Sequence, residues 1–517
     1  TMLRRSFHQM FHLFCLLSVA FFMPLSVWMV SVFSISMAVN WIIGFEYREK
    51  GKIVTEKKEL LLIPALFLLY VVWLLNTSNF SQAITEFKLK LPLLLFPLLA
   101  GAYGNFSSRR YRMILLAFIA GCVVAVAAGY AVLAGFIHTP VRDSRDLSLF
   151  LPSIRLSILV NMALFAALYL AFNSETGPFT LRVLLVVVAL MMGLFLFRLL
   201  SVTGIIILVL ISLISAVYFL TISRKWIVGL ITSTAAILAV IFFTAGMSRA
   251  WSNLHIPDNP EVNNVTEKTP SGHNYKSLPE ENLLERGYLV WNNVCEEEMK
   301  TQWNQRSRIP YDSTDMAGND LRVTLIRYVS YLGMRKDSAA IANLSRKDIK
   351  NIEAGFANPL YADIGNPLAK WYEVAWQIDR RLKGGNPSGH SVTQRLEFYK
   401  ASVFIIRQNP LTGTGTGDVR KAFDDAYRFT DSPLTPEYRL MAHNQYLTFA
   451  ITFGIPGMIL ALCLMLSPAI VARKRLNYLF VIFLAIIFIS MFNDDTFESA
   501  IGTTFFSYFY TLFLLIE

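Results

Sequence analysis

One histidine stands where a long polar segment of this chain returns to a hydrophobic run. His443 lies in the heptapeptide Met-Ala-His-Asn-Gln-Tyr-Leu at 441–447, and Asn444 follows it directly. A buried or half-buried imidazole can accept and return a proton near neutral pH, which few other side chains can do. The dipole at a helix N-terminus also disfavours the imidazolium and keeps the ring neutral. His443 is therefore a candidate general base, and Asn444 can either bind a polar ligand or cap the helix.

Basic side chains stand at the ends of several apolar runs and at the start of the last polar helix. Arg and Lys form charge-assisted hydrogen bonds with phosphate oxygens. Such residues at the ends of membrane helices can also extend toward the polar interface without binding any ligand. Both interpretations stay open for each of them. The residues are Lys88, Lys90, Arg155, Arg198 and Arg395.

A glycine-rich segment separates Arg395 from His443. Residues 409–417 read Asn-Pro-Leu-Thr-Gly-Thr-Gly-Thr-Gly. A bare Gly-x-Gly-x-Gly is weak evidence for phosphate binding, and no βαβ pattern surrounds this one. We favour a tight turn that directs the helix of Arg395 toward His443, with phosphate binding through backbone N–H groups as the alternative. Further on, Gly454 and Gly457 permit a kink and close helix contact.

The composition predicts that helices in a membrane position these residues. Of 517 residues, 54% are hydrophobic and only 16% are charged, and the mean hydropathy is +0.47. A soluble domain carries about a quarter charged residues. Apolar runs long enough to cross about 30 Å of hydrocarbon recur along the chain, which predicts an all-α polytopic membrane protein with about twelve transmembrane helices. The runs are 9–26, 28–45, 60–76, 89–104, 112–137, 155–173, 181–197, 200–221, 226–246, 442–468, 475–492 and 499–516.

The distribution of charge predicts the orientation. With the N-terminus inside, the N-terminal arm and the short inner loops hold sixteen Lys or Arg and five acidic residues, whereas the short outer loops hold six basic residues. This asymmetry follows the positive-inside rule and predicts that both termini are cytoplasmic. The net charge of +11 is therefore explained by the orientation in the membrane and by contact with anionic membrane lipids. The sequence shows no pattern typical of nucleic-acid binding.

The long polar segment at 247–440 is predicted to be a mainly helical domain on the outer face. It holds 25 basic and 24 acidic residues, so it is close to neutral. Apolar residues at three- and four-residue spacing predict helices there, and the stretch 257–281 reads as a loop. These helices are expected at 322–333, 345–357, 371–382 and 392–408. The domain organisation is then nine membrane helices in 1–246, the loop domain in 247–440, and three membrane helices in 441–517.

Residue types that bind metals are sparse. The four cysteines form no disulfide framework or Cys-based metal site, and apart from His8 and His12, which are four positions apart, no histidine pair has a ligand spacing. Asp494, Asp495 and Glu498 make one acidic group on a short outer loop. This group could hold a divalent ion on a diphosphate, orient an arginine or contact a sugar. We expect neither a metal nor a cofactor.

The order of these motifs resembles the O-antigen ligases and polymerases, a family of bacterial membrane glycosyltransferases. The resemblance rests on the pattern from Arg395-Leu-Glu-Phe-Tyr to the glycine-rich segment, then on His443-Asn444 and Gly454-x-x-Gly457. The layout of about twelve helices with a large loop before helix 10 is similar as well. The family's functional histidine and loop arginine match His443 and Arg395.

The resemblance implies a metal-independent transferase in the bacterial inner membrane, with its site on the periplasmic face and 247–440 in the periplasm. It implies transfer of an O-antigen glycan from undecaprenyl pyrophosphate to lipid A–core, with inversion. A donor that is already activated fits this location, since no nucleotide is expected there. The family's arginine at the start of the sixth span matches Arg155, and its lysine before the fourth matches Lys90. These two and Arg395 would stabilise the leaving pyrophosphate while His443 deprotonates the acceptor.

One departure from the family pattern concerns the start of the eighth span. The family often has Ser-Arg-x-Gly there, whereas Ser201-Val202-Thr203-Gly204 has valine at the second position. Arg198, one turn earlier, is the candidate replacement, and otherwise that role is absent.

Three other functions stay open. An O-antigen polymerase uses the same donor with a lipid-linked acceptor, and a protein O-glycosyl ligase uses Ser or Thr. We favour the ligase because one large loop precedes the histidine motif. A transporter would need charged residues deep in several spans, and here the ionisable groups cluster at helix ends. The oligomeric state is not indicated.

Overall fold

The computed structural model describes residues 2–44, 47–101, 104–139, 143–173, 177–224, 226–278, 283–363, 366–472 and 477–516. Parts of the predicted inner loops, at 46, 174–176, 225 and 473–476, lie outside these residues, as do 279–281 of the predicted loop at 257–281. The chain forms two compact units. Unit 1 comprises Thr1–Thr139, Arg145–Ile237 and Gln394–Glu517, and unit 2 comprises Pro140–Ser144 and Leu238–Thr393.

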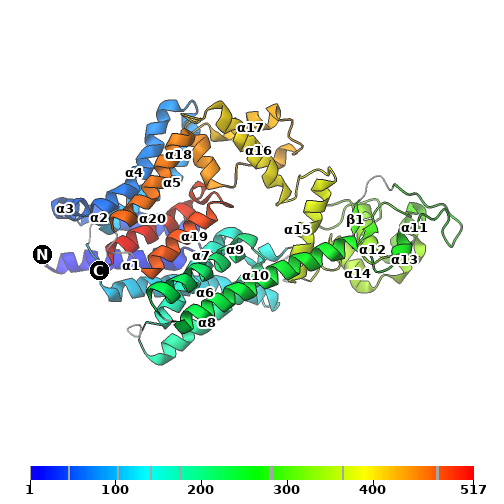
Figure 1. Ribbon diagram of the computed structural model, residues 1–517, viewed down its shortest axis with the longest axis horizontal. Helices are drawn as coiled ribbons and strands as arrows, with labels where there is room; N and C mark the ends of the chain where they lie inside the picture. The colour runs from blue at the N-terminus through cyan, green and yellow to red at the C-terminus, as the bar shows by residue number, and fades with distance from the viewer. Residues whose placement is uncertain are drawn as a thin grey trace. The chain divides into compact units, whose positions relative to one another are not determined.

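In the part of unit 1 that the structure describes, the regular elements are helices (Figure 1). Its helices are α1 (Met2–Phe22), α2 (Val27–Ile43), α3 (Tyr47–Glu56), α4 (Lys58–Val72), α5 (Phe80–Gly101), α6 (Ser108–Leu133), α7 (Ser153–Ala171), α8 (Phe179–Leu199), α9 (Val202–Val217), the start of α10 (Trp226–His255), α16 (Thr393–Gln408), α17 (Val419–Phe429), α18 (Gln445–Val471), α19 (Tyr478–Ser490) and α20 (Ala500–Leu515). Short 3-10 turns precede or follow some of them, at η1 (Trp73–Asn76), η2 (Ser144–Leu147) and η9 (Thr496–Glu498).

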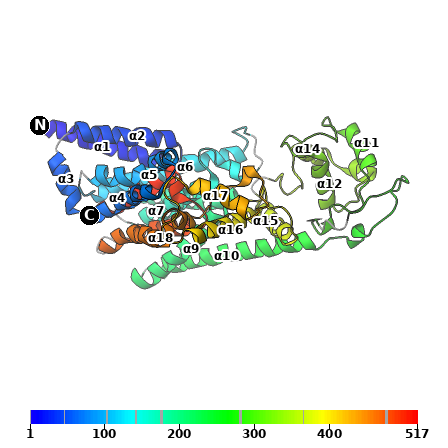
Figure 2. The same ribbon diagram turned by 90° about the horizontal axis from the view of Figure 1, so that it is seen from above.

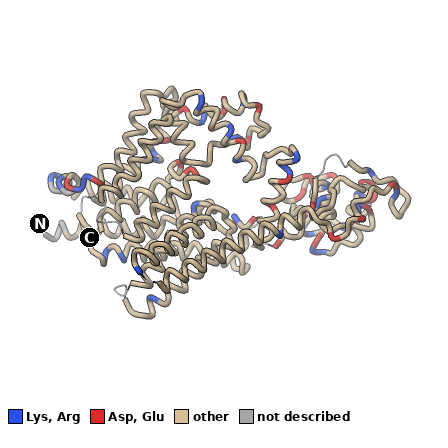
Figure 3. Tube along the Cα trace, in the orientation of Figure 1, with Lys and Arg blue, Asp and Glu red and all other residues tan. Residues whose placement is uncertain are grey.

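Seven helices among the described residues are long and apolar enough to cross a membrane, and four shorter apolar helices accompany them. The protein is therefore a polytopic helical membrane protein, and the number of twelve spans stays a prediction. The long helices carry few charged residues, as their long tan stretches in Figure 3 show. The expected separations within 9–45 and 181–221 are confirmed, because α1 and α2 are distinct helices, and so are α8 and α9. Figure 2 shows α1 and α2 side by side.

Helix α20 lies at the centre of unit 1. Every residue from Ile501 to Leu515 is buried, and the helix packs against α5 and α19. Phe483 of α19 meets the rings of Phe505 and Phe509 at centroid distances of 5.5 and 6.2 Å. A helix that is apolar on all sides belongs in a protein core or a membrane, and α20 is enclosed by its neighbours. This core fixes the short loop between α19 and α20, which forms part of the site described below.

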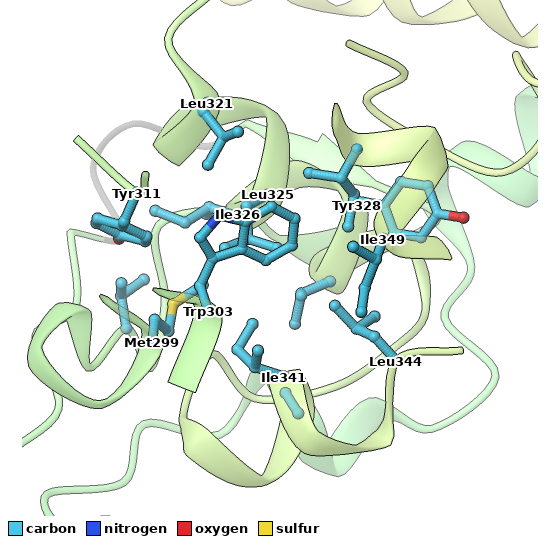
Figure 4. Close-up of a cluster of buried hydrophobic side chains, with 14 of the residues drawn as sticks. Met299, Trp303, Tyr311, Leu321, Leu325, Ile326, Tyr328, Ile341, Leu344 and Ile349 are labelled. Carbon is cyan, nitrogen blue, oxygen red and sulfur yellow. The ribbon is translucent and has the colours of Figure 1, made fainter. Parts of the chain in front are cut away.

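Unit 2 combines short helices with one small hairpin. Its helices after α10 are α11 (Glu296–Arg306), α12 (Leu321–Tyr331), α13 (Ser338–Asn343), α14 (Arg346–Glu353) and α15 (Pro367–Leu382), and its strands β1 (Leu284–Glu285) and β2 (Tyr288–Leu289) pair antiparallel. Trp303 is fully buried in the main apolar cluster (Figure 4). The helices expected near 322–333, 345–357 and 371–382 are confirmed by α12, α14 and α15. Helix α11 was not expected, because only Met299 and Trp303 supply its buried apolar face.

The polar segment 247–440 is divided between the two units. Helices α16 and α17 belong to unit 1, where Phe398 and Tyr427 form one apolar cluster with Ala442 and Ile451. A boundary between the two compact units falls at residues 393 and 394, and the predicted limit of the loop domain at residue 440 stays a prediction. Charge patterning could not reveal the boundary at 393 and 394, because the buried faces of α16 and α17 pack against each other, against α18 and against the turn before it. The helix expected at 392–408 is α16.

Candidate active site

Helix α18 is broken at Gly454, and the glycine-rich segment 409–417 fills the break. Gly454 has φ 72° and ψ 173°, a conformation that few residues other than glycine adopt. The break frees the carbonyls of Ile451 and Thr452, which accept hydrogen bonds from the backbone N–H groups of Thr414 at 2.8 Å and Gly415 at 3.1 Å. Backbone groups at membrane depth need such partners, since no water is available to them. The segment thus ties the end of α16 to α18.

Two further N–H groups of the glycine-rich segment also have partners within the protein. Gly413 donates to Asn409 O at 3.0 Å, and Gly417 donates to Thr77 Oγ1 at 3.3 Å. Asp418, directly after the segment, accepts from the backbone N–H of Ser78. These contacts favour the tight turn over the phosphate-binding alternative.

Gly415→Ala is expected to destabilise the protein strongly. A Cβ at this position would lie 2.3 Å from Asn76 O, and its φ is +93°. The left-handed conformation and the overpacking together should cost about 2–5 kcal/mol. Gly135→Ala is the matched control, because its φ is +76° but a Cβ there meets nothing within 4 Å. Thermal unfolding in detergent measures both, and equal shifts in melting temperature would contradict the close approach.

The turn that carries His443 is fastened to the loop between α19 and α20. Asn444 caps α18 by accepting a hydrogen bond from Leu447 N at 3.1 Å. Its amide nitrogen donates to Phe492 O at 3.1 Å. Of the two roles expected for Asn444, the structure therefore displays the helix cap.

Asp495 is the central group of this loop. It is 6% exposed, and its Oδ1 accepts from Asn444 N at 3.0 Å and from Thr448 Oγ1 at 2.8 Å. Its Oδ2 lies 4.0 Å from His443 Nδ1. The backbone N–H of His443 also bonds to the carboxylate, which supports the left-handed φ of +47° at His443. That conformation costs on the order of 1–3 kcal/mol in a residue other than glycine and is often found at functional sites.

The surroundings favour a neutral imidazole at His443. Burial lowers the pKa of His443 below its usual 6.5, and the positive charges of Arg395 and Arg155 lower it further, whereas Asp494 opposes them. Burial also raises the pKa of both Asp494 and Asp495. The imidazole is still 39% exposed, so a ligand can reach it. The electrostatics therefore suit a group that accepts a proton near neutral pH.

Two arginines from distant helices converge near His443. The guanidinium of Arg395, on α16, donates to Asn493 Oδ1, and the amide of Asn493 donates to Thr203 Oγ1 on α9. Arg155 stands in the first turn of α7, half-buried. Its Nε is buried without a hydrogen-bond partner among the residues that the structure describes. One arginine is thus held in place by an amide, and the other keeps a donor for a ligand.

The Ser201–Gly204 segment contributes to this region despite its valine. Ser201 Oγ lies 3.1 Å from Ser157 Oγ, and a Cβ at Gly204 would lie 2.6 Å from Ser157 Cβ. The close contact packs α9 against α7, two residues beyond Arg155. Arg198 is exposed in the last turn of α8.

Lys90 is enclosed in a cluster of acidic side chains. It is 0% exposed, its Nζ lies 2.6 Å from Glu86 Oε2, and it also pairs with Glu498. The ammonium stands 5.2 Å from the centre of the Tyr70 ring. Lys88, two residues earlier on α5, is exposed. Of the two lysines, Lys90 therefore already has its charge matched within the protein.

The acidic group at 494–498 makes protein contacts in this structure. Asp495 bonds to the histidine turn, and Glu498 pairs with Lys90. Within the described ranges, no group of three or more His, Cys, Asp or Glu side chains could hold a metal ion.

Several residues of the site escaped sequence reasoning. Asn493 was hidden beside the more conspicuous Asp494, although an amide next to a carboxylate pair is a reasonable candidate for orienting an arginine. Thr448 lies four residues after Asn444 and therefore on the same face of α18, which is a weak signal. The partnership of Glu86 with Lys90 was visible as an i,i+4 pair on one helix.

Residues 356–462 match the family model described as O-antigen ligase. The matched stretch contains Arg395, the glycine-rich segment and His443, and it ends within α18. The match confirms the resemblance that the motifs indicated, and it supports a ligase- or polymerase-type glycosyl transfer in general. No curated protein matches the chain.

Proposed function

We propose that this protein is an O-antigen ligase. It transfers a glycan from undecaprenyl pyrophosphate to a sugar hydroxyl of lipid A–core, on the periplasmic face of the inner membrane, without a metal. The observation that carries the proposal is the imidazole of His443, whose pKa is lowered and whose Nδ1 faces Asp495, beside two arginines. The family match across the same stretch supports it.

The proposed mechanism is a single displacement at the anomeric carbon. Asp495 favours the tautomer with the proton on Nδ1, so that Nε2 of His443 is free to accept the proton of the acceptor hydroxyl. The acceptor oxygen attacks the anomeric carbon while the bond to the pyrophosphate oxygen breaks, and the configuration inverts. The leaving pyrophosphate takes the bonding electrons, and the guanidinium groups of Arg155 and Arg395 stabilise its charge. Lys90 acts as a positioning residue, since two carboxylates already neutralise it.

Purified protein with a defined lipid-linked donor tests the proposal. Lipid A–core, a second lipid-linked glycan and a Ser/Thr peptide are supplied separately as acceptors. We expect transfer to lipid A–core, with excess EDTA present and ATP absent. Transfer to the lipid-linked glycan alone would make the protein a polymerase, and transfer to the peptide alone a protein ligase. Loss of transfer on chelation, restored by Mg²⁺ or Mn²⁺, would overturn the metal-free mechanism.

The pH dependence of kcat/KM is expected to reflect the lowered pKa of His443. A general base works in its neutral form, so the rate should fall as the pH drops through that pKa, which lies below 6.5. Activity should therefore persist from neutral pH to below 6.5. In Arg395→Gln, which removes one cause of the shift, the acidic limb of the residual activity should move to higher pH. An acidic limb centred above 6.5 in the wild type contradicts this assignment.

A further inference from the structure

A small cleft opens beside the histidine turn, and its lining surface is mostly apolar with several polar side chains among it. Its enclosed volume is about 50 Å³, and it lies within a space of about 450 Å³ that includes the open solvent at its mouth. Thr448 lines the cleft and donates to Asp495, so one side chain connects the cleft to the carboxylate that faces His443. All its lining residues belong to unit 1. They are Tyr70, Gln82, Glu86, Thr416, Val419, Arg420, Met441, Thr448, Thr452 and Glu498.

One buried hydroxyl of this cleft has no hydrogen-bond partner among the described residues. Tyr70 is 3% exposed, and its hydroxyl makes no hydrogen bond to any residue in the described part of the chain. Buried hydroxyl groups normally have a partner, because leaving one unpaired is unfavourable. The ring of Tyr70 is held by the ammonium of Lys90 above it. The hydroxyl is thus available to a ligand in the cleft.

The charges of the cleft favour a neutral ligand. Glu86 and Glu498 share the ammonium of Lys90, and the exposed Arg420 adds a second cation. Two carboxylates in the lining repel a phosphate. They do accept hydrogen bonds from hydroxyl groups, and both keep some exposure, at 15% and 11% of their side chains. Val419 adds apolar surface.

We propose that this cleft binds a neutral sugar ring of one of the two substrates. Ring hydroxyls donate to Glu86 and Glu498 and accept from the Tyr70 hydroxyl and from Arg420, while the apolar side chains contact the C–H face of the ring. The inference deepens the proposed function and rests on it. The ring comes either from the core oligosaccharide of the acceptor or from the glycan of the donor, and the two sources predict different kinetics.

Tyr70→Phe is the decisive variant, because it removes one hydroxyl that has no partner among the described residues. The melting temperature should therefore stay unchanged. The KM for one substrate should rise about 2- to 12-fold, the value of one neutral hydrogen bond, while kcat changes less. A rise for lipid A–core assigns the cleft to the acceptor, and a rise for the lipid-linked glycan assigns it to the donor. Unchanged KM values for both substrates would overturn the proposal.

A second pair of variants tests the mouth of the cleft. Arg420→Gln should raise the same KM as Tyr70→Phe, whereas Lys421→Gln, its exposed neighbour on α17, should not. Equal increases in KM for Arg420→Gln and Lys421→Gln would mean that KM responds only to surface charge, and this result would contradict the proposal.

Calorimetric titration with free sugars separates this inference from the proposed function. The probes are the core oligosaccharide released from the acceptor and the glycan released from the donor. If the wild-type protein transfers no glycan but binds one probe more tightly than Tyr70→Phe does, the proposed function is wrong and sugar binding in the cleft is supported. If transfer proceeds and each probe binds the wild-type protein and Tyr70→Phe with equal affinity, sugar binding in the cleft is excluded and the proposed function is supported.

Discussion

Replacing His443 by alanine should reduce glycan transfer by about 10²- to 10⁴-fold, the usual contribution of a general base. The imidazole is neutral near pH 7, accessible, and faces Asp495 through Nδ1. Folding should survive, since alanine keeps the backbone N–H that bonds to Asp495. Asp495→Asn should also lower kcat, because an amide can favour the wrong tautomer of the imidazole. Transfer from a purified lipid-linked donor, measured with melting temperature, tests both variants.

His138→Ala provides the matched control. His138 is another exposed histidine that is predicted on the outer side, between the fifth and sixth spans. Its replacement should leave transfer within twofold of wild type. Near-normal transfer by His443→Ala would show that His443 is not the general base. A large fall in the melting temperature of His443→Ala would show that the substitution disrupts the fold of the turn, so that loss of transfer could not be assigned to the missing base.

Arg155→Ala and Arg395→Ala should each lower kcat by about 10²- to 10³-fold. Removing one donor that stabilises a developing negative charge costs about 2.7–4 kcal/mol of transition-state stabilisation. Lysine should restore only part of the activity, because an ammonium cannot bind phosphate through two parallel hydrogen bonds as a guanidinium does. Single-turnover rates with saturating donor measure the effect on the chemical step.

Arg407→Ala is the control for Arg395, because it removes an exposed arginine from the same helix. If kcat of both Arg155→Ala and Arg395→Ala stays within twofold of the wild-type value, these arginines bind no substrate and only extend toward the polar interface of the membrane. Arg198→Ala tests whether Arg198 takes the role of the arginine that the family often has at the position of Val202. A silent Arg198→Ala would show that Arg198 does not replace the arginine missing at Val202.

Much of the architecture could be predicted because hydrophobicity acts locally. A run of about twenty apolar residues has few stable locations other than a membrane or a core, so its position along the chain predicts a helix. The separation of α8 from α9 also has its cause in adjacent residues, because Leu200 adopts a left-handed conformation and Ser201 caps the next helix. The candidate base was visible as well, because a histidine at the border of an apolar run is unusual.

The sequence by itself determined the class of membrane protein, the identity of the candidate base and the arginines available to it. Tertiary structure decided which groups meet. Lys90 and Glu498 are 408 positions apart, and their ion pair depends on α5 packing against α20. The glycine-rich segment hydrogen-bonds to α18 only because Gly454 breaks that helix and frees two carbonyls. Partners so distant in the chain leave no periodic signal, because their contact arises from the packing of whole helices.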